Sequence, residues 1–150
     1  MAEYQIASRL GPDNAGVQNS VAWDLVLAPG RPRQAYDMGL TYARKAVELA
    51  PQDGGILNTL ALAEYRAGHW AESIAAGERA MALRKGGDAS DWFFLAMARW
   101  RKGEAAEARR WFDRAVAWTS EKDPRNTELR QFWAEAAELL GQPGPGEGRR

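Results

Sequence analysis

The 150-residue chain contains no cysteine and only one histidine. The absence of cysteine excludes disulfide frameworks, thiolate zinc sites and cysteine nucleophiles, and it leaves the redox compartment open. The 20 Lys and Arg residues balance 20 Asp and Glu residues, which argues against a dedicated nucleic-acid binder or a polybasic membrane-surface protein. Val, Ile and Thr together number only 12, against 28 Ala. That bias disfavours sheets and favours closely packed helices.

Long hydrophobic runs are also missing. The longest uninterrupted apolar run covers seven residues, 92–98, far below the roughly 18 that a membrane-spanning helix needs. Near the N-terminus, Glu3 and Arg9 interrupt the first turns, and no apolar segment of the kind found in a signal peptide follows. We therefore expect a cytoplasmic protein that does not enter a membrane.

Proline and glycine divide the chain into short stretches in which apolar residues recur three and four positions apart, as in a helix. This spacing predicts eight helices, near residues 2–10, 15–28, 33–50, 55–67, 71–85, 89–102, 105–120 and 124–140. Asp53, Ser90 and Asp123 are the candidate N-caps, and Pro124 would occupy the first helical position after Asp123. The Gly- and Pro-rich residues 142–150 are predicted to be a disordered tail.

The chain resembles itself at a fixed offset. Leu60 and Ala61 fall on Leu95 and Ala96 at an offset of 35 residues, and the same shift superposes Tyr65 on Trp100, Gly68 on Gly103, Ala80 on Ala115 and Leu83 on Trp118. Residues 19–22 match residues 58–61 at 39 residues, because the loop at 28–32 is longer. Small residues within the helices and a glycine at the turn allow two antiparallel helices to approach closely.

These residues resemble the tetratricopeptide repeat, a helix-turn-helix pattern of 34 residues. The third unit matches best, through Trp92, Leu95, Ala96, Gly103, Ala108, Phe112 and Ala115. The second departs at Ser73, Gly77 and Lys85, where the family has an alanine, an aromatic residue and a proline. The resemblance implies an all-α, right-handed solenoid of antiparallel helix pairs, with about three repeats, flanking half-repeats and a C-terminal capping helix.

The resemblance also implies the domain organisation. Residues 1–14 would end a truncated preceding repeat, followed by repeats at 15–52, 53–87 and 88–122, a capping helix at 123–141 and the tail at 142–150. A half-repeat cannot bury its apolar side alone, so we expect the chain to be the C-terminal piece of a larger array. Similar arrays end some bacterial multidomain regulatory proteins, including some with kinase modules.

Residues that could support catalysis are few. His69 lies in a turn beside Trp70 and is interpreted as structural, because a catalytic base needs a nucleophile or an orienting partner. The sequence contains no zinc or calcium motif, and the glycines at 86 and 87 lack the strand and spacing of a phosphate-binding loop. The arginines between 99 and 114 alternate with acids, which indicates a solvated helix face and not a nucleic-acid site. We expect no enzyme activity, metal or cofactor.

By resemblance, the first helix of each repeat lines a concave groove that binds a partner. The family's groove positions fall here on Asn19, Trp23, Val26, Asn58, Leu62, Tyr65, Arg66, Phe93, Met97, Trp100 and Arg101. Such a lining suits an extended or helical peptide, although Tyr65 and Trp100 could instead pack between neighbouring helices. The remaining aromatic residues are assigned to packing, namely Trp92, Trp111, Phe112, Trp118 and Trp133, with Trp70 in a turn.

Some members of the family hold the acidic C-termini of chaperones with Lys, Arg and Asn side chains. The corresponding positions here are Asn19, Trp23, Thr59, Ser90 and Phe94, so that carboxylate clamp is absent. The sequence therefore predicts a non-catalytic scaffold for a protein or peptide partner. Two alternatives remain: self-assembly through Tyr4, Ile6 and Leu10, or a module that positions a catalytic domain located upstream.

Overall fold

A computed structural model of the chain describes residues 11–146, and this part is entirely helical, with no strand. Its seven helices are α2 (Ala15–Val26), α3 (Arg33–Leu49), α4 (Gly54–Arg66), α5 (Trp70–Leu83), α6 (Ala89–Arg101), α7 (Ala105–Lys122) and α8 (Thr127–Leu140). The all-α prediction is confirmed, and the helices expected between residues 15 and 140 are all present. The helix expected at 2–10, with Tyr4, Ile6 and Leu10, lies outside the described residues.

Side-chain caps fix where the first helices of the pairs begin. Asp53 accepts a hydrogen bond from the Ile56 amide at 3.1 Å, which confirms it as the N-cap of α4. Ser90 is not a cap: Asp88 caps α6, and Asp91 completes a capping box with it.

The predicted start of α8 is also wrong. Asn126, and not Asp123, caps the helix by accepting a hydrogen bond from the Leu129 amide at 2.9 Å. Helix α7 continues to Lys122, so α8 begins at Thr127, three residues after Pro124.

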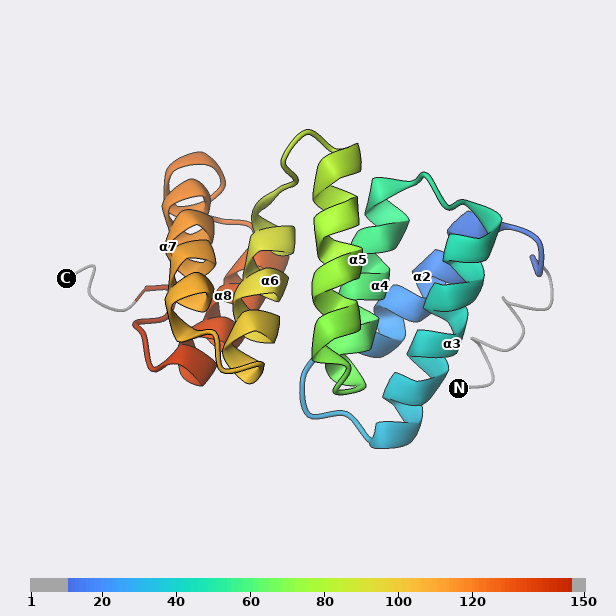
Figure 1. The fold of residues 1–150 in the computed structure, drawn as a ribbon, viewed down its shortest axis with the longest axis horizontal. Coiled ribbons are helices and arrows are strands. Elements are labelled where there is room, and N and C mark those ends of the chain that lie inside the picture. Colours follow the sequence, from blue (N-terminus) through green and yellow to red (C-terminus); the bar gives the residue numbers. More distant parts are fainter. Residues whose placement is uncertain (1–10, 147–150) are drawn as a thin grey trace.

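The helices pack as adjacent antiparallel pairs, α2 with α3, α4 with α5 and α6 with α7 (Figure 1). The alanines that the repeat analysis aligned are almost completely buried where the helices meet: Ala22, Ala46, Ala61, Ala80, Ala96 and Ala115. Helices α2, α4 and α6 contact one another in sequence and form one layer, whereas α3, α5 and α7 each contact the helix before and the helix after them and form a second layer. Small side chains therefore set the close spacing within each pair.

The turns inside the second and third pairs have the same geometry. Gly68 has φ +84° and Gly103 has φ +85°, a left-handed conformation that favours glycine. The first pair differs, because its longer loop is held by Tyr36: the hydroxyl group donates to the Ala28 carbonyl at 2.7 Å and accepts from the Arg31 amide at 3.1 Å. The 35-residue offset thus corresponds to two turns of one shape and a third that is built differently.

The last helix turns onto the first layer. Helix α8 packs chiefly against α6 and less against α7. Its Phe132 lies edge-on to Phe94 of α6, with ring centroids 4.8 Å apart, and to Trp23 of α2, at 5.9 Å. An aromatic cluster therefore joins the beginning and the end of the described chain.

The prediction of a disordered tail needs correction for residues 142–146. The Trp133 indole donates a hydrogen bond to the Pro143 carbonyl at 3.2 Å, and Gly144 is buried against the domain. This contact gives the segment a defined place beside α8, whereas residues 147–150 lie outside the described part.

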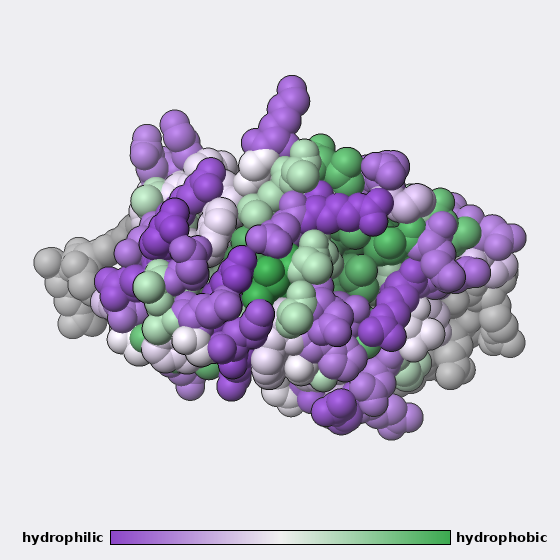
Figure 2. Space-filling model, viewed as in Figure 1, coloured by the Kyte–Doolittle hydropathy of each residue, from purple (hydrophilic) through white to green (hydrophobic). Residues whose placement is uncertain are grey.

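Charged residues cover much of the surface over α7 and α3, and apolar residues gather near the middle of the same face, around α5 (Figure 2). Within residues 11–146, no helix combines the length and apolar character required to cross a membrane.

Candidate functional site

The groove residues expected from the sequence all lie on α2, α4 and α6, the layer on which α8 packs. We call the side of this layer that α8 covers the inner face. Helix α8 reaches both of the other helices through long side chains: the Trp23 indole donates to Glu128 Oε2 at 3.2 Å, and Arg66 forms an ion pair with Glu135. The inner face is therefore partly occupied by a helix of the same chain.

Four of the expected groove residues belong to the core instead. Val26, Leu62, Phe93 and Met97 have no exposed surface, so the expectation that they contact a partner is corrected. The reason is packing against neighbouring helices, which the contact of Phe93 of α6 with Phe112 of α7 at 6.2 Å illustrates. Asn19 is half-buried, and its side-chain oxygen has no hydrogen-bond partner within residues 11–146.

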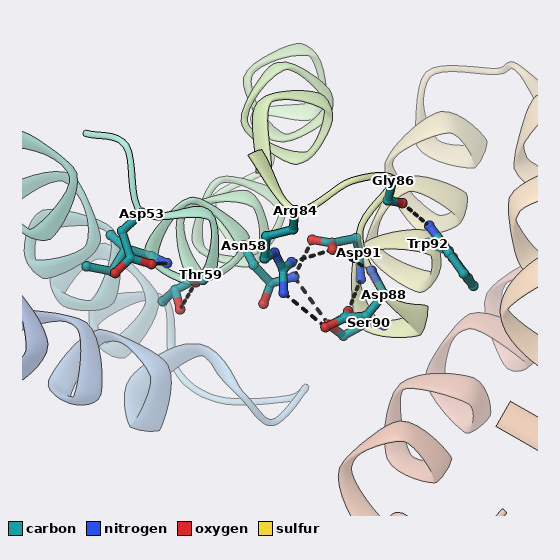
Figure 3. Close-up of polar contacts among 11 residues, drawn as sticks. Asp53, Asn58, Thr59, Arg84, Gly86, Asp88, Ser90, Asp91 and Trp92 are labelled. Atoms are coloured by element: carbon teal, nitrogen blue, oxygen red, sulfur yellow. Dashed lines mark hydrogen bonds and ion pairs between the residues drawn. The ribbon is translucent and has the colours of Figure 1, made fainter. Parts of the chain in front are cut away.

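Asn58 is also buried, and it belongs to a polar network at the connection between α5 and α6 (Figure 3). Its amide nitrogen donates to Asp91 Oδ1 at 2.7 Å and to Ser90 Oγ at 3.3 Å. Arg84 forms ion pairs with Asp91 and, at 3.0 Å, with Asp88. The network links α4 to the connection between α5 and α6, and it occupies both amide hydrogens of Asn58.

Burial affects the two carboxylates of this network differently. Burial raises the pKa of Asp91 despite the hydrogen bonds from the Asp88 amide and Asn58 and the charge of Arg84. Burial also opposes ionisation of Asp88, but the hydrogen bond from Ser90 and the charge of Arg84 outweigh it and hold the pKa of Asp88 below its ordinary value. The charge of Asp88 therefore stabilises the connection at neutral pH.

Arg66 was expected to edge an open groove, but its side chain is only 4% exposed. The guanidinium group donates to the Val26 carbonyl at 2.7 Å and the Leu27 carbonyl at 3.0 Å, and it forms a two-pronged contact with Glu135. It also lies over the Tyr36 ring at 5.7 Å. Arg66 is thus a buried connection between α2, α4 and α8.

Part of the inner face stays open beyond the middle of α8. Trp100 is 37% exposed, and the neighbouring Arg101 is exposed and has no ion pair with any residue in 11–146. Arg101 donates to the Tyr65 hydroxyl at 3.3 Å and lies over the Trp70 ring at 5.7 Å. A cavity of 410 Å³ adjoins these groups, lined by Pro29, Tyr65, Arg101, Glu135, Glu138 and Leu139, and we call it the Tyr65 cavity.

Tyr65 lines this cavity, but most of its side chain is buried. It is only 6% exposed, its ring lies 5.3 Å from that of Trp70, and burial raises the pKa of its hydroxyl group. The structure supports the packing alternative for Tyr65, and contact of Tyr65 with a partner stays a prediction. Trp100 and Arg101 are the exposed members of the predicted set, and Asn19 and Trp23 are half-buried.

A second cavity, of 280 Å³, lies at the other end of α8, and we call it the Trp118 cavity. It is lined by Trp23, Asn58, Asp88, Ala89, Ser90, Trp118, Asp123, Asn126, Glu128, Leu129 and Phe132. The assignment of Trp118 to core packing is wrong, because this residue is 36% exposed. Leu83, which the 35-residue offset superposes on Trp118, is likewise exposed, at 39%.

The other tryptophan assignments differ in outcome. Trp92 and Trp133 are buried, as predicted, and Trp111 is half-buried. Trp70 is the first residue of α5 and packs on Tyr65. Arg114 lies over the Trp92 ring at 4.2 Å and over the Trp111 ring at 5.4 Å.

His69 and the arginine-rich segment have local partners. His69 Nδ1 lies 2.8 Å from Glu64 Oε1, and Glu64 also accepts from Arg44 at 3.2 Å. On α7, Arg109 pairs with Asp113 at 2.9 Å and Arg110 pairs with Glu107 at 2.7 Å. The acids in this segment thus pair with the arginines at helical spacing, as the sequence predicts.

No protein-family model matches this sequence, and no curated protein matches it. Within residues 11–146, no group of three or more His, Asp or Glu side chains is placed to hold a metal ion. The Tyr65 cavity and the Trp118 cavity are the candidate site.

Proposed function

We propose that this chain is a non-catalytic protein-interaction module with the architecture of the tetratricopeptide repeat. In this proposal, the three helix pairs are successive repeats of a right-handed solenoid, and α8 is the capping helix. The matching left-handed glycines at 68 and 103, the buried alanines at the aligned positions and the two-layer packing support this assignment.

The partner segment binds at the open end of the inner face. One observation carries this proposal: Arg101 lines the Tyr65 cavity without an acidic partner in the described chain, and Trp100, next to it in α6, is 37% exposed. A partly exposed tryptophan supplies a large, rigid contact area, and a guanidinium group can take a carboxylate through two hydrogen bonds. The site therefore fits a peptide or helix that carries an acidic residue next to an apolar one.

Selection from a random peptide library displayed on phage, with the full-length chain as bait, tests this function. The affinity of the selected peptides is then measured by fluorescence anisotropy for Trp100→Ala and Arg101→Gln. We expect each substitution to weaken binding at least tenfold, because the tryptophan area or the cationic donor is lost.

Arg109→Gln is the matched control, since it removes one exposed arginine from α7 at a distance from the cavity. Tyr65→Phe is preferred to Tyr65→Ala, because it removes only the hydroxyl group that accepts from Arg101 and keeps the buried ring. Selected peptides that bind all of these variants equally well would place the interaction elsewhere and contradict the proposal.

A further inference from the structure

The Trp118 cavity has aromatic walls that no cation covers. Trp23 and Trp118 line it from α2 and α7, and Phe132 lines it from α8. Three other tryptophan rings of the described chain carry an arginine: Arg114 lies over Trp92 and Trp111, and Arg101 lies over Trp70. Within residues 11–146 no arginine or lysine lies over Trp23 or Trp118, so these two indoles remain available to a cation from outside.

The polar lining of this cavity is acidic. Asp88, Asp123 and Glu128 supply three carboxylates, and no Lys, Arg or His belongs to the lining. The Asp88 carboxylate already has partners in the chain, because it caps α6 and pairs with Arg84 at 3.0 Å. Asp123 and Glu128 form no ion pair with any residue of 11–146, so their negative charge is not neutralised within the described structure.

Hydrogen bonds hold both of these carboxylates at the cavity. The Trp23 indole donates to Glu128 Oε2 at 3.2 Å, and the Asn126 amide donates to Asp123 Oδ2 at 3.0 Å. Asp123 also ends α7, where the negative end of the helix dipole adds to its charge. The neighbouring N-terminus of α8 is capped by Asn126, which satisfies the Leu129 amide without adding a charge.

From this arrangement we propose that the Trp118 cavity binds a basic side chain, arginine or lysine, of a partner segment. A cavity of 280 Å³ has room for one such side chain. The indole faces attract the cation, the apolar stem packs on Phe132 and Leu129, and the carboxylates accept its hydrogen bonds. The inference rests on the proposed protein-binding function and specifies the chemistry of the partner.

The positions of the two cavities along α8 predict the orientation of a bound partner segment. Residues 126–132 of α8 line the Trp118 cavity, and residues 135–139 line the Tyr65 cavity. One partner segment that follows α8 would place its basic residue at the acidic cavity and its acidic residue at Arg101. The centres of residues 126–132 and 135–139 are eight residues apart, so with a rise of about 1.5 Å per residue they lie roughly 12 Å from each other, or about four residues of extended chain.

NMR of the full-length ¹⁵N-labelled chain tests the proposal through the indole N–H signals of Trp23 and Trp118, assigned with Trp23→Phe and Trp118→Phe. Titration with N-acetyl-arginine amide should shift both signals saturably, in the low millimolar range expected for a single-residue probe. N-acetyl-glutamine amide at the same ionic strength should leave them unchanged. The variant with Asp123→Asn and Glu128→Gln should bind the arginine probe at least tenfold more weakly.

The matched control carries Glu107→Gln and Asp113→Asn, which remove the same charge from the outer side of α7. Arginine binding that is unchanged in the cavity variant, or weakened equally in the control, overturns the proposal. Spermidine that binds tenfold more tightly than the arginine probe also overturns it, because the cavity would then select a free polyamine. If Trp100→Ala abolishes peptide binding but the Trp23 and Trp118 signals do not respond to the arginine probe, this inference alone is rejected. The proposed interaction function is then retained.

Discussion

Replacement of Arg66 by methionine should be among the most damaging single changes in the chain. The substitution removes a guanidinium group whose side chain is 4% exposed and leaves the carboxylate of Glu135, itself only 15% exposed, without its partner. It also removes the donors to the Val26 and Leu27 carbonyls at the end of α2. Breaking a buried ion pair in this way costs about 3 to 5 kcal/mol of unfolding free energy.

Urea unfolding at neutral pH, followed by far-UV circular dichroism, measures this loss. For a domain of this size each kcal/mol corresponds to roughly 2 to 4 °C in the melting temperature, so the Arg66→Met variant should melt about 6 to 20 °C lower. Glu135→Leu should cost a similar amount, because it leaves the buried guanidinium group unpaired. The double variant should lose less than the sum of the two, by about 2 kcal/mol or more.

Arg66→Lys is the informative control. It retains the positive charge but cannot make the forked contacts to Glu135 and to both carbonyls, so it should recover only part of the stability. Additive effects of Arg66→Met and Glu135→Leu, or a loss of under about 1 kcal/mol for Arg66→Met, would refute the view that this pair holds α8 to α2 and α4.

Two further predictions concern the connections between helices. Because the pKa of Asp88 is lowered, its charge stabilises the fold above the ordinary value of 3.8, and that contribution is lost as the pH falls through the lowered pKa. Asp88→Asn should therefore cost about 0.5 to 1 kcal/mol of unfolding free energy at neutral pH, a small loss because the Asp88 side chain is half exposed. The unfolding free energies of the variant and the parent should converge below pH 3.8. A difference that stays constant with pH would contradict a stabilising role for the Asp88 charge. Gly39→Ala should cost about 1 to 3 kcal/mol of unfolding free energy, measured by urea unfolding, since the added Cβ would lie 2.4 Å from Val26 Cγ1. Gly30→Ala adds a Cβ that meets nothing within 4 Å at a position with φ +80°, so it tests backbone strain alone.

Helix positions and pair contacts were accessible from the sequence because they depend on local spacing. Apolar periodicity located every helix between residues 15 and 140, and the 35-residue offset identified alanines that are buried at the contacts. The same offset, applied to Asp53, leads to Asp88 and would have corrected the cap assigned to Ser90. The 35-residue offset does not predict the start of α8, because α7 has 18 residues where α5 has 14.

The site was less predictable, because it depends on contacts between distant parts of the chain. The family resemblance assigned these side chains to a groove, but it carries no information on whether another helix covers them. Phe93 and Met97 are covered, whereas Trp100 and Arg101 are exposed. Trp23 and Glu128 are 105 residues apart and Arg66 and Glu135 are 69 apart, and no local pattern couples residues at such separations.

The contacts of α8 with α2 and α4 also limit how this molecule can vary in length. In an open array of helix pairs each unit contacts only its neighbours, so units can be gained or lost one at a time. Here, an extra pair between α4 and α6 would carry α8 out of reach of Trp23 and Arg66, and deletion of a pair would remove one of their helices. Because α8 contacts α2, α4 and α6 together, geometry sets the number of helix pairs between α2 and α8.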